Sequence, residues 1–121
     1  MKKHIVVVDD ESSIRDLLGE FLTLSGYRVT TAQSALEAQR AVEREAPDLI
    51  VSDLQLEDSD GLDLIAELKT TLPNTPVILL TGVHFDPKVA KEILSKKVSC
   101  YLQKTSPLSK ILEEVRRLIG S

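Results

Sequence analysis

Four short apolar runs divide this chain, and each is followed directly by polar residues. The runs are 5–8, 49–52, 77–80 and 100–103, and the residues that follow them are Asp9 with Asp10, Asp53, Thr81 and Lys104. Apolar residues at successive positions are typical of parallel strands that helices cover on both faces. The carboxyl ends of such strands lie at one edge of the sheet, where open α/β folds bind ligands. We therefore expect these polar residues to meet at one site.

The segments between the runs have the apolar periodicity of amphipathic helices. Capping and proline signals place the expected helices between Ser12 or Ser13 and Gly26, from Ser34 to before Pro47, after Gly61 and before Pro73, from Pro87 to about Lys96, and from Pro107 onward. A further short strand is expected at 27–32, where β-branched residues are frequent. Five alternating strands and helices with right-handed crossovers predict an α/β sandwich of three layers around a five-stranded parallel sheet.

Length and charge narrow the class of protein. With 121 residues the chain is long enough for one domain, which we expect to span 1–121. The net charge of −4 argues against direct binding to nucleic acid or to an anionic membrane. Cys100 is the single cysteine, so no internal disulfide is possible, and its apolar surroundings predict a buried thiol. Asp9 and Asp10 end the first apolar run far short of a membrane span or signal peptide, so we expect a cytoplasmic protein.

The polar residues expected at the sheet edge have the chemistry of phosphoryl transfer. Asp9, Asp10 and Asp53 repel one another unless a cation joins them. Oxygen ligands without His or Cys favour Mg²⁺, or Mn²⁺, over zinc. Lys104 and Thr81 supply an ammonium and a hydroxyl that can neutralise a dianionic group. Because an aspartate can act as nucleophile through an aspartyl phosphate, the pattern predicts phosphoryl transfer onto one Asp.

Over essentially its whole length the chain resembles the receiver domains of two-component response regulators. The residues that carry the resemblance are Asp9, Asp10 and Glu11 after two valines, Asp53 with Asp60 and Gly61, Leu80 with Thr81 and Gly82, and Tyr101, Leu102, Gln103 and Lys104. Each fragment is modest, but their order and spacing together are specific. The resemblance implies a flavodoxin-like fold of five βα units whose parallel strands lie in the order 2-1-3-4-5.

The resemblance also implies a role for each residue of the site. Asp53 accepts a phosphoryl group from a phosphohistidine on a sensor histidine kinase or a phosphotransfer protein. Mg²⁺ is bound by Asp10, by Asp9 directly or through water, by Asp53 and by the backbone carbonyl of Gln55. Lys104 pairs first with the carboxylate and then with the phosphate.

A two-state switch is implied as well. Thr81 is drawn to the phosphoryl oxygen, and Tyr101 turns inward as Thr81 shifts; the alternative for Tyr101 is a strand aromatic packed against the last helix. The surface that changes is that of the fourth helix, fifth strand and fifth helix. The domain is then regulatory and not an enzyme, although it supports its own phosphorylation and dephosphorylation. The kinase, the downstream effector, and the choice between monomer and phosphorylation-induced homodimer stay open.

The sequence departs from the family at three places. Thr105 follows Lys104 where the family usually has a proline after a cis bond. Because a cis bond before a non-proline residue costs about 2.5–4 kcal/mol, this bond is either cis and strained or trans with Lys104 aimed by other means. Glu57 stands where the loop usually has a proline. Gln55 and Val83 border the site, and we expect them to change the lifetime of the phosphoryl group.

Three other classes of protein compete with this one. A Mg²⁺-dependent aspartyl phosphatase needs a second acidic residue two positions after the nucleophile, where this chain has Gln55. A flavin binder needs a phosphate-binding loop after the first strand, where Asp9 and Asp10 would repel a phosphate. A degenerate receiver that only binds other proteins stays open because of Thr105.

Overall fold

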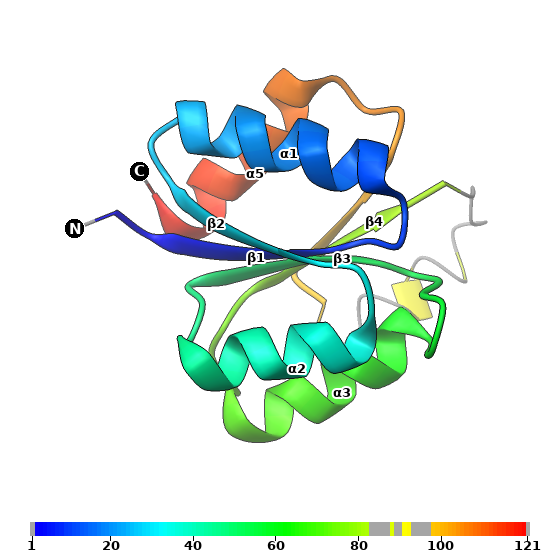
Figure 1. Cartoon of the computed structure of the whole chain (residues 1–121). Coiled ribbons are helices and arrows are strands. Elements are labelled where there is room, and N and C mark those ends of the chain that lie inside the picture. The colour runs from blue at the N-terminus through cyan, green and yellow to red at the C-terminus, as the bar shows by residue number, and fades with distance from the viewer. Residues whose placement is uncertain (1, 83–87, 89–90, 93–97, 121) are drawn as a thin grey trace.

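The computed structural model describes residues 2–82, 88, 91–92 and 98–120, and in them five parallel strands form one sheet (Figure 1). The strands are β1 (His4–Val8), β2 (Arg28–Ala32), β3 (Leu49–Asp53), β4 (Val77–Thr81) and β5 (Cys100–Gln103). Their order in the sheet is β2-β1-β3-β4-β5, and every neighbouring pair is parallel. Both the number of strands and the order predicted for the flavodoxin-like fold are therefore confirmed.

Helices cover both faces of the sheet. They are α1 (Ser12–Leu24), α2 (Ala35–Arg44), α3 (Gly61–Thr71) and α5 (Leu108–Ile119). Figure 1 shows α1 and α5 on one face, and α2 and α3 on the other. The helix predicted from Pro87 to Lys96 falls mostly outside the described residues. Within the described part of the chain, no helix has the length and apolar character needed to cross a bilayer.

Two hydrophobic clusters form the core, one on each face of the sheet. Val6, Val8, Ile50 and Leu79 belong to the cluster under α2 and α3. The strand residues of the cluster under α1 and α5 are Ile5, Val7, Leu49, Val51, Ile78 and Leu80. Because neighbouring residues of a strand point to opposite faces, both sets are buried, and this explains why the runs do not alternate.

The start of α1 differs from the prediction. Glu11, with extended backbone, is the N-cap residue, and no side chain caps this end. Ser12 and Ser13 are the first two helical residues, so the prediction that one of them caps the helix is wrong. The amides of Ile14 and Arg15 both donate to the carbonyl oxygen of Glu11 at 3.2 Å, which shows that the helix begins one residue earlier than the serine signal suggests.

Two other helix ends follow the sequence signals. Gly26 has φ of 105°, the left-handed region that glycine tolerates, and Tyr27 donates its N–H to the carbonyl of Leu22 at 3.1 Å. Ser34 caps α2, since its hydroxyl oxygen accepts from the Glu37 N–H at 3.2 Å. These ends fix where the chain enters β2 and leaves it.

Candidate functional site

The strand ends of β3, β4 and β5 open into one cavity of about 280 Å³. Its lining residues are Asp10, Glu11, Asp53, Gln55, Thr81, Gly82 and Lys104. Asp9 lies beside it, with a carboxylate oxygen near those of Asp10 and Asp53. The parallel register puts the carboxyl ends of neighbouring strands at one edge, since Asp53 pairs with Leu80 and Thr81 with Gln103. The fold thus brings together the polar residues that follow the four apolar runs.

Three carboxylates form the acidic part of the site. One oxygen each from Asp9, Asp10 and Asp53 lies within 4.8 Å of the others. Asp9 and Asp53 are buried, whereas Asp10 is exposed. Burial raises the pKa of the Asp9 carboxyl, although hydrogen bonds from the Glu11 amide (2.9 Å) and from Lys104 lower it in part. Removing the two buried carboxylates of Asp9 and Asp53 from water is costly unless positive charge accompanies them.

Lys104 supplies that positive charge. Its Nζ lies 3.0 Å from Oδ2 of Asp9, 3.1 Å from Oδ2 of Asp53 and 3.2 Å from Oε1 of Glu11. Burial lowers the pKa of Lys104, but hydrogen bonds and charges from Asp9, Asp53 and Glu11 outweigh it and raise the pKa overall. The ammonium therefore stays charged and bridges three carboxylates, two of them buried. The contact with Glu11 was not assigned from the sequence.

The backbone after β5 aims Lys104 without a cis bond. The peptide bond between Lys104 and Thr105 is trans. The Lys104 N–H donates to the carbonyl of Thr81 at 2.7 Å, and the Ser106 N–H donates to that of Gln103 at 2.9 Å. These bonds hold the start of the turn against β4. Of the two possibilities raised by Thr105, the trans alternative is the one found.

The loop between β3 and α3 is tied down at several points. Gln55 pairs with Asp60 in an isolated bridge, and the Gly61 N–H donates to the Leu54 carbonyl at 2.7 Å. Asp58 reaches across to α2, where its two carboxylate oxygens accept from backbone amides. Sequence reasoning missed this role of Asp58. The only local signal was a carboxylate in a loop, and its partners are 22 and 23 residues away.

A second cation touches the loop after β1. Nη1 of Arg15, on α1, donates to the backbone carbonyl of Asp9 at 2.8 Å. The sequence does not predict this contact, because an arginine in the first turns of a helix is common and does not indicate which carbonyl it will bind. It holds the turn that presents Asp9.

The predicted switch residues lie on two neighbouring strands. Thr81, at the end of β4, is 1% exposed and borders the cavity. Tyr101, on β5, is half-buried and packs against the cluster under α2 and α3. Cys100 and Leu102 face the opposite cluster, which contains α5, so Tyr101 is not placed against the last helix. Val83, the other residue expected to border the site, lies outside the described residues.

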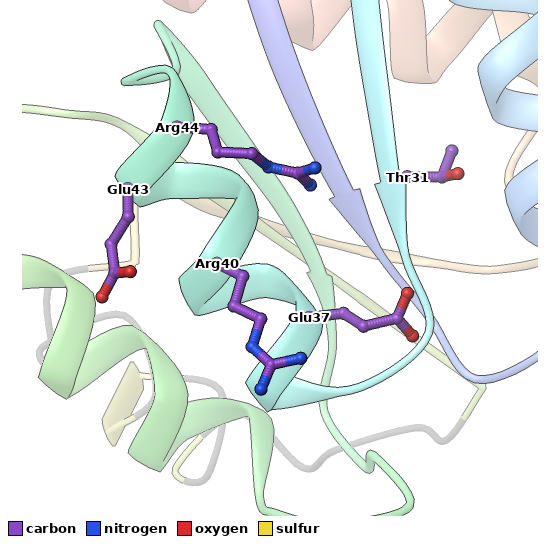
Figure 2. A pocket seen from close by; sticks show the side chains of 5 residues that line it. All are labelled: Thr31, Glu37, Arg40, Glu43 and Arg44. Carbon is purple, nitrogen blue, oxygen red and sulfur yellow. The ribbon is translucent and has the colours of Figure 1, made fainter.

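A larger hollow of about 500 Å³ lies between α2 and the edge strand β2 (Figure 2). It is lined by Thr31, Glu37, Arg40, Glu43 and Arg44, and Figure 2 shows Arg44 and Glu37 directed from α2 toward β2. The charges around it are mixed, and none of the polar residues at the strand ends lines it. Size therefore does not identify the reactive site; the chemistry is concentrated in the smaller cavity.

Comparison with known proteins agrees with this geometry. The family model of the response regulator receiver domain matches residues 5–116. The transcriptional regulatory protein GlrR of Escherichia coli K12 is 45% identical over 79 residues, which are 65% of this chain and 18% of GlrR. The DNA-binding transcriptional regulator NtrC of the same organism is 34% identical over 121 residues, or 99% of this chain and 26% of NtrC. The chain thus spans about a quarter or less of these relatives.

Solved structures of receiver domains have the same fold as this chain. The receiver domain of NtrX from Brucella abortus has 31% sequence identity and a TM-score of 0.88, with 97% of this chain and 98% of that one covered. A receiver domain protein from Methanospirillum hungatei has a TM-score of 0.89 at 26% identity, with 97% and 93% covered. With a matching family model, fold and relatives, the chain belongs to the response regulator receiver domain family of two-component signal transduction.

Proposed function

We propose that this chain is a phosphorylation-dependent switch in which Asp53 accepts a phosphoryl group. The observation that carries the proposal is the position of Lys104 Nζ, which lies 3.1 Å from Asp53 and 3.0 Å from Asp9. A single ammonium shared by two buried carboxylates can move toward a third anion that arrives between them. Such neutralisation is what a phosphoryl group on a carboxylate requires.

The residues fit a magnesium ion. Oδ2 of Asp9 is buried, lies near Lys104 and makes no hydrogen bond, so it keeps a lone pair for a ligand. The donor set of Asp9, Asp10 and Asp53 contains only oxygen, which suits Mg²⁺ or Mn²⁺. We assign these three carboxylates and the backbone carbonyl of Gln55 as the groups that would hold it. When bound, the ion supplies positive charge for the phosphoryl oxygens.

The chain's own residues carry out the transfer. A carboxylate oxygen of Asp53 attacks phosphorus, and the bond between phosphorus and the imidazole nitrogen of the donor phosphohistidine breaks. The electron pair of that bond stays with the imidazole. Lys104 then binds a phosphoryl oxygen in place of the Asp53 oxygen, and the Thr81 hydroxyl donates to another. Hydrolysis by water at the same site returns Asp53 to its free form, so the domain regulates its own lifetime in the phosphorylated state.

The change at Thr81 passes to the surface through the neighbouring strand. The Lys104 amide is hydrogen-bonded to the Thr81 carbonyl, and β4 pairs with β5 along Ile78–Thr81. A shift of Thr81 therefore moves the strand that carries Tyr101. We propose that the surface of β5, α5 and the segment 87–96, which the sequence predicts to be a helix, is the region that changes. The added charge of the phosphoryl group biases that change.

The partners follow from the family and its relatives. The phosphodonor is a sensor histidine kinase or a phosphotransfer protein. GlrR and NtrC are named as transcriptional regulators, so we propose that this domain controls an effector. We further propose that residues 1–121 form a single domain and that this domain does not itself contact DNA. Its oligomeric state is either monomeric or a homodimer formed on phosphorylation.

Intact mass after incubation with Mg²⁺ and acetyl phosphate tests the proposal. The wild type is expected to gain one phosphoryl group, and Asp53→Asn none. The decay of the modified species then gives the lifetime of the phosphoryl group, which we expect Gln55 and Val83 to change. If folded wild type that binds Mg²⁺ gains nothing, the chain is a degenerate receiver that works only by protein contacts.

A further inference from the structure

The loop that follows Asp53 is held in place by a helix that is distant in the sequence. Oδ1 of Asp58 accepts from the Ala35 N–H at 2.9 Å, and Oδ2 accepts from the Leu36 N–H at 3.2 Å. Both amides belong to the first turn of α2, and neither has a partner within the helix. One exposed carboxylate thus joins the β3–α3 loop to the start of α2, at the same edge of the sheet.

This contact completes the first turn of α2. Ser34 accepts from the Glu37 N–H through its hydroxyl and from the Ala38 N–H through its carbonyl. Asp58 accepts from the Ala35 and Leu36 N–H groups, so every N–H from Ala35 to Ala38 has an acceptor. The bonds from Ala35 and Leu36 lower the pKa of Asp58, and a smaller loss of hydration opposes them. If the loop moved, two backbone donors would lose their protein acceptors.

The loop also carries Gln55, whose carbonyl is assigned above to the magnesium site. Between Gln55 and Asp58, Leu56 is buried in the core and its amide donates to the Ser59 carbonyl at 3.0 Å. Glu57 is exposed, and none of the residues 54–60 is a proline. The loop therefore lacks the rigid φ of a proline, and Asp58 anchors it from the next position instead.

We propose that Asp58 is a positioning residue that fixes the β3–α3 loop on α2 and thereby sets the affinity of the site for Mg²⁺ through Gln55. The proposal rests on the proposed function, because it assumes that the Gln55 carbonyl is a metal ligand. Asp58 is not one of the three carboxylates that lie within 4.8 Å of one another. Its two hydrogen bonds restrict the loop so that the carbonyl is held in place before the ion arrives.

Calorimetric titration with MgCl₂, without a phosphodonor, tests this proposal. Asp58→Ala removes both acceptors, and we expect its Kd for Mg²⁺ to rise about three- to tenfold, below the roughly 10–100-fold usual for a group that touches a metal ligand directly. Asp58→Asn keeps one acceptor oxygen, so it is expected to fold and to show a smaller rise. Faster amide exchange at Ala35 and Leu36 should accompany the loss.

Two variants separate this effect from charge and from helix stability. Glu57→Gln removes one negative charge from the same loop and no hydrogen bond of Asp58, so its Kd is expected to match the wild type. Ser34→Ala weakens the same end of α2 from the helix side and leaves the loop bonds in place. It is expected to lower stability without changing the Kd.

The outcomes are distinct. Equal Kd values for Asp58→Ala and wild type would overturn the positioning role while leaving the proposed function intact. The positioning role would also be overturned if the Kd for Mg²⁺ rose as much in Ser34→Ala as in Asp58→Ala, because the stability of α2 alone would then explain the change. Wild type that binds no Mg²⁺ and accepts no phosphoryl group would overturn the proposed function, and the positioning role with it.

Discussion

A Cβ atom built on Gly61 would lie 2.0 Å from the backbone carbonyl oxygen of Asp53. Gly61 is the first residue of α3, and its own N–H donates to the Leu54 carbonyl at 2.7 Å. The helix that follows the loop is therefore packed directly against the end of the strand that presents Asp53. Only a residue without a side chain allows this approach.

Gly61→Ala is expected to destabilise the protein, because the group it would strike is backbone at the end of a buried strand. We expect a loss of about 1–3 kcal/mol in the free energy of unfolding, the usual cost of overpacking. Phosphorylation from acetyl phosphate should slow as well, since Asp53 must shift. Urea denaturation and intact mass measure the two effects.

Gly19→Ala is the matched control. Gly19 lies inside α1, and a Cβ there would meet only Cγ2 of Thr31, at 3.5 Å. Alanine in a helix interior is favoured over glycine by roughly 0.5–1 kcal/mol. We expect Gly19→Ala to stabilise the fold and Gly61→Ala to do the opposite. Similar behaviour of the two variants would show that α3 relaxes away from Asp53 at little cost.

Lys104→Met is expected to tighten Mg²⁺ binding while slowing phosphorylation. The ammonium of Lys104 lies against Asp9 and Asp53, so it repels a cation that approaches the same carboxylates. Without the ammonium, the negative charges of Asp9 and Asp53 have no positive partner at this site, and a divalent ion that binds there is attracted more strongly. Calorimetric titration should show a Kd several-fold lower than that of the wild type.

Lys110→Met provides the comparison for Lys104→Met. Lys110 is an exposed lysine on α5 that pairs with Glu114 at 3.6 Å. The substitution Lys110→Met removes the same charge from the domain without changing any contact of the acidic cluster. If both variants change the Kd equally, the effect is one of net charge, and Lys104 does not compete with the metal.

The parts of the fold that could be predicted are those that depend on local pattern. The apolar runs located the strands because both faces of the sheet are covered, as the full burial of Ile5–Val8 shows. Gly26 and Ser34 marked helix ends because their signals act within a few residues. At the start of α1, Ser12 and Ser13 also suggested an N-cap serine, but the N-cap residue is Glu11 and both serines lie inside the helix.

The geometry of the site could be predicted only in part. That Asp53, Thr81 and Lys104 share one edge follows from parallel strands, and no tertiary detail is needed. How Lys104 is aimed could not be read from the chain, because it depends on the turn held by Thr81. The bond from Asp58 to α2 depends on how a loop packs against a helix more than twenty residues away.

Tyr27→Phe is expected to loosen the end of α5. Tyr27 is 1% exposed, and its hydroxyl donates to the carbonyl of Gly120 at 2.5 Å. The bond joins the segment before β2 to the residue that ends the last helix. Its removal should cost about 0.5–1.5 kcal/mol, the usual net value of one hydrogen bond. Chemical denaturation measures the loss, and unchanged stability would show that water replaces the hydroxyl fully.

Asp9→Asn is expected to stabilise the metal-free protein at neutral pH. Because burial raises the pKa of Asp9, the folded protein holds that proton more tightly than the unfolded chain does. The stabilisation of the folded protein by protonated Asp9 is complete below the pKa of the unfolded chain, near 3.8. It is lost as pH rises through the pKa of Asp9 in the folded protein. Ionised Asp9 therefore costs stability at neutral pH, and asparagine removes that cost, by an amount on the order of 1 kcal/mol.

Urea denaturation with a chelator, from about pH 4 to about pH 7, checks the sign. The advantage of Asp9→Asn should shrink as pH falls, because the wild type then becomes protonated as well. Magnesium should reverse the comparison: at ten times its Kd it stabilises the wild type by about 1.4 kcal/mol, and it should stabilise Asp9→Asn far less. An asparagine variant that is less stable at every pH would mean that the attraction between Asp9 and Lys104 exceeds the cost of burying the carboxylate.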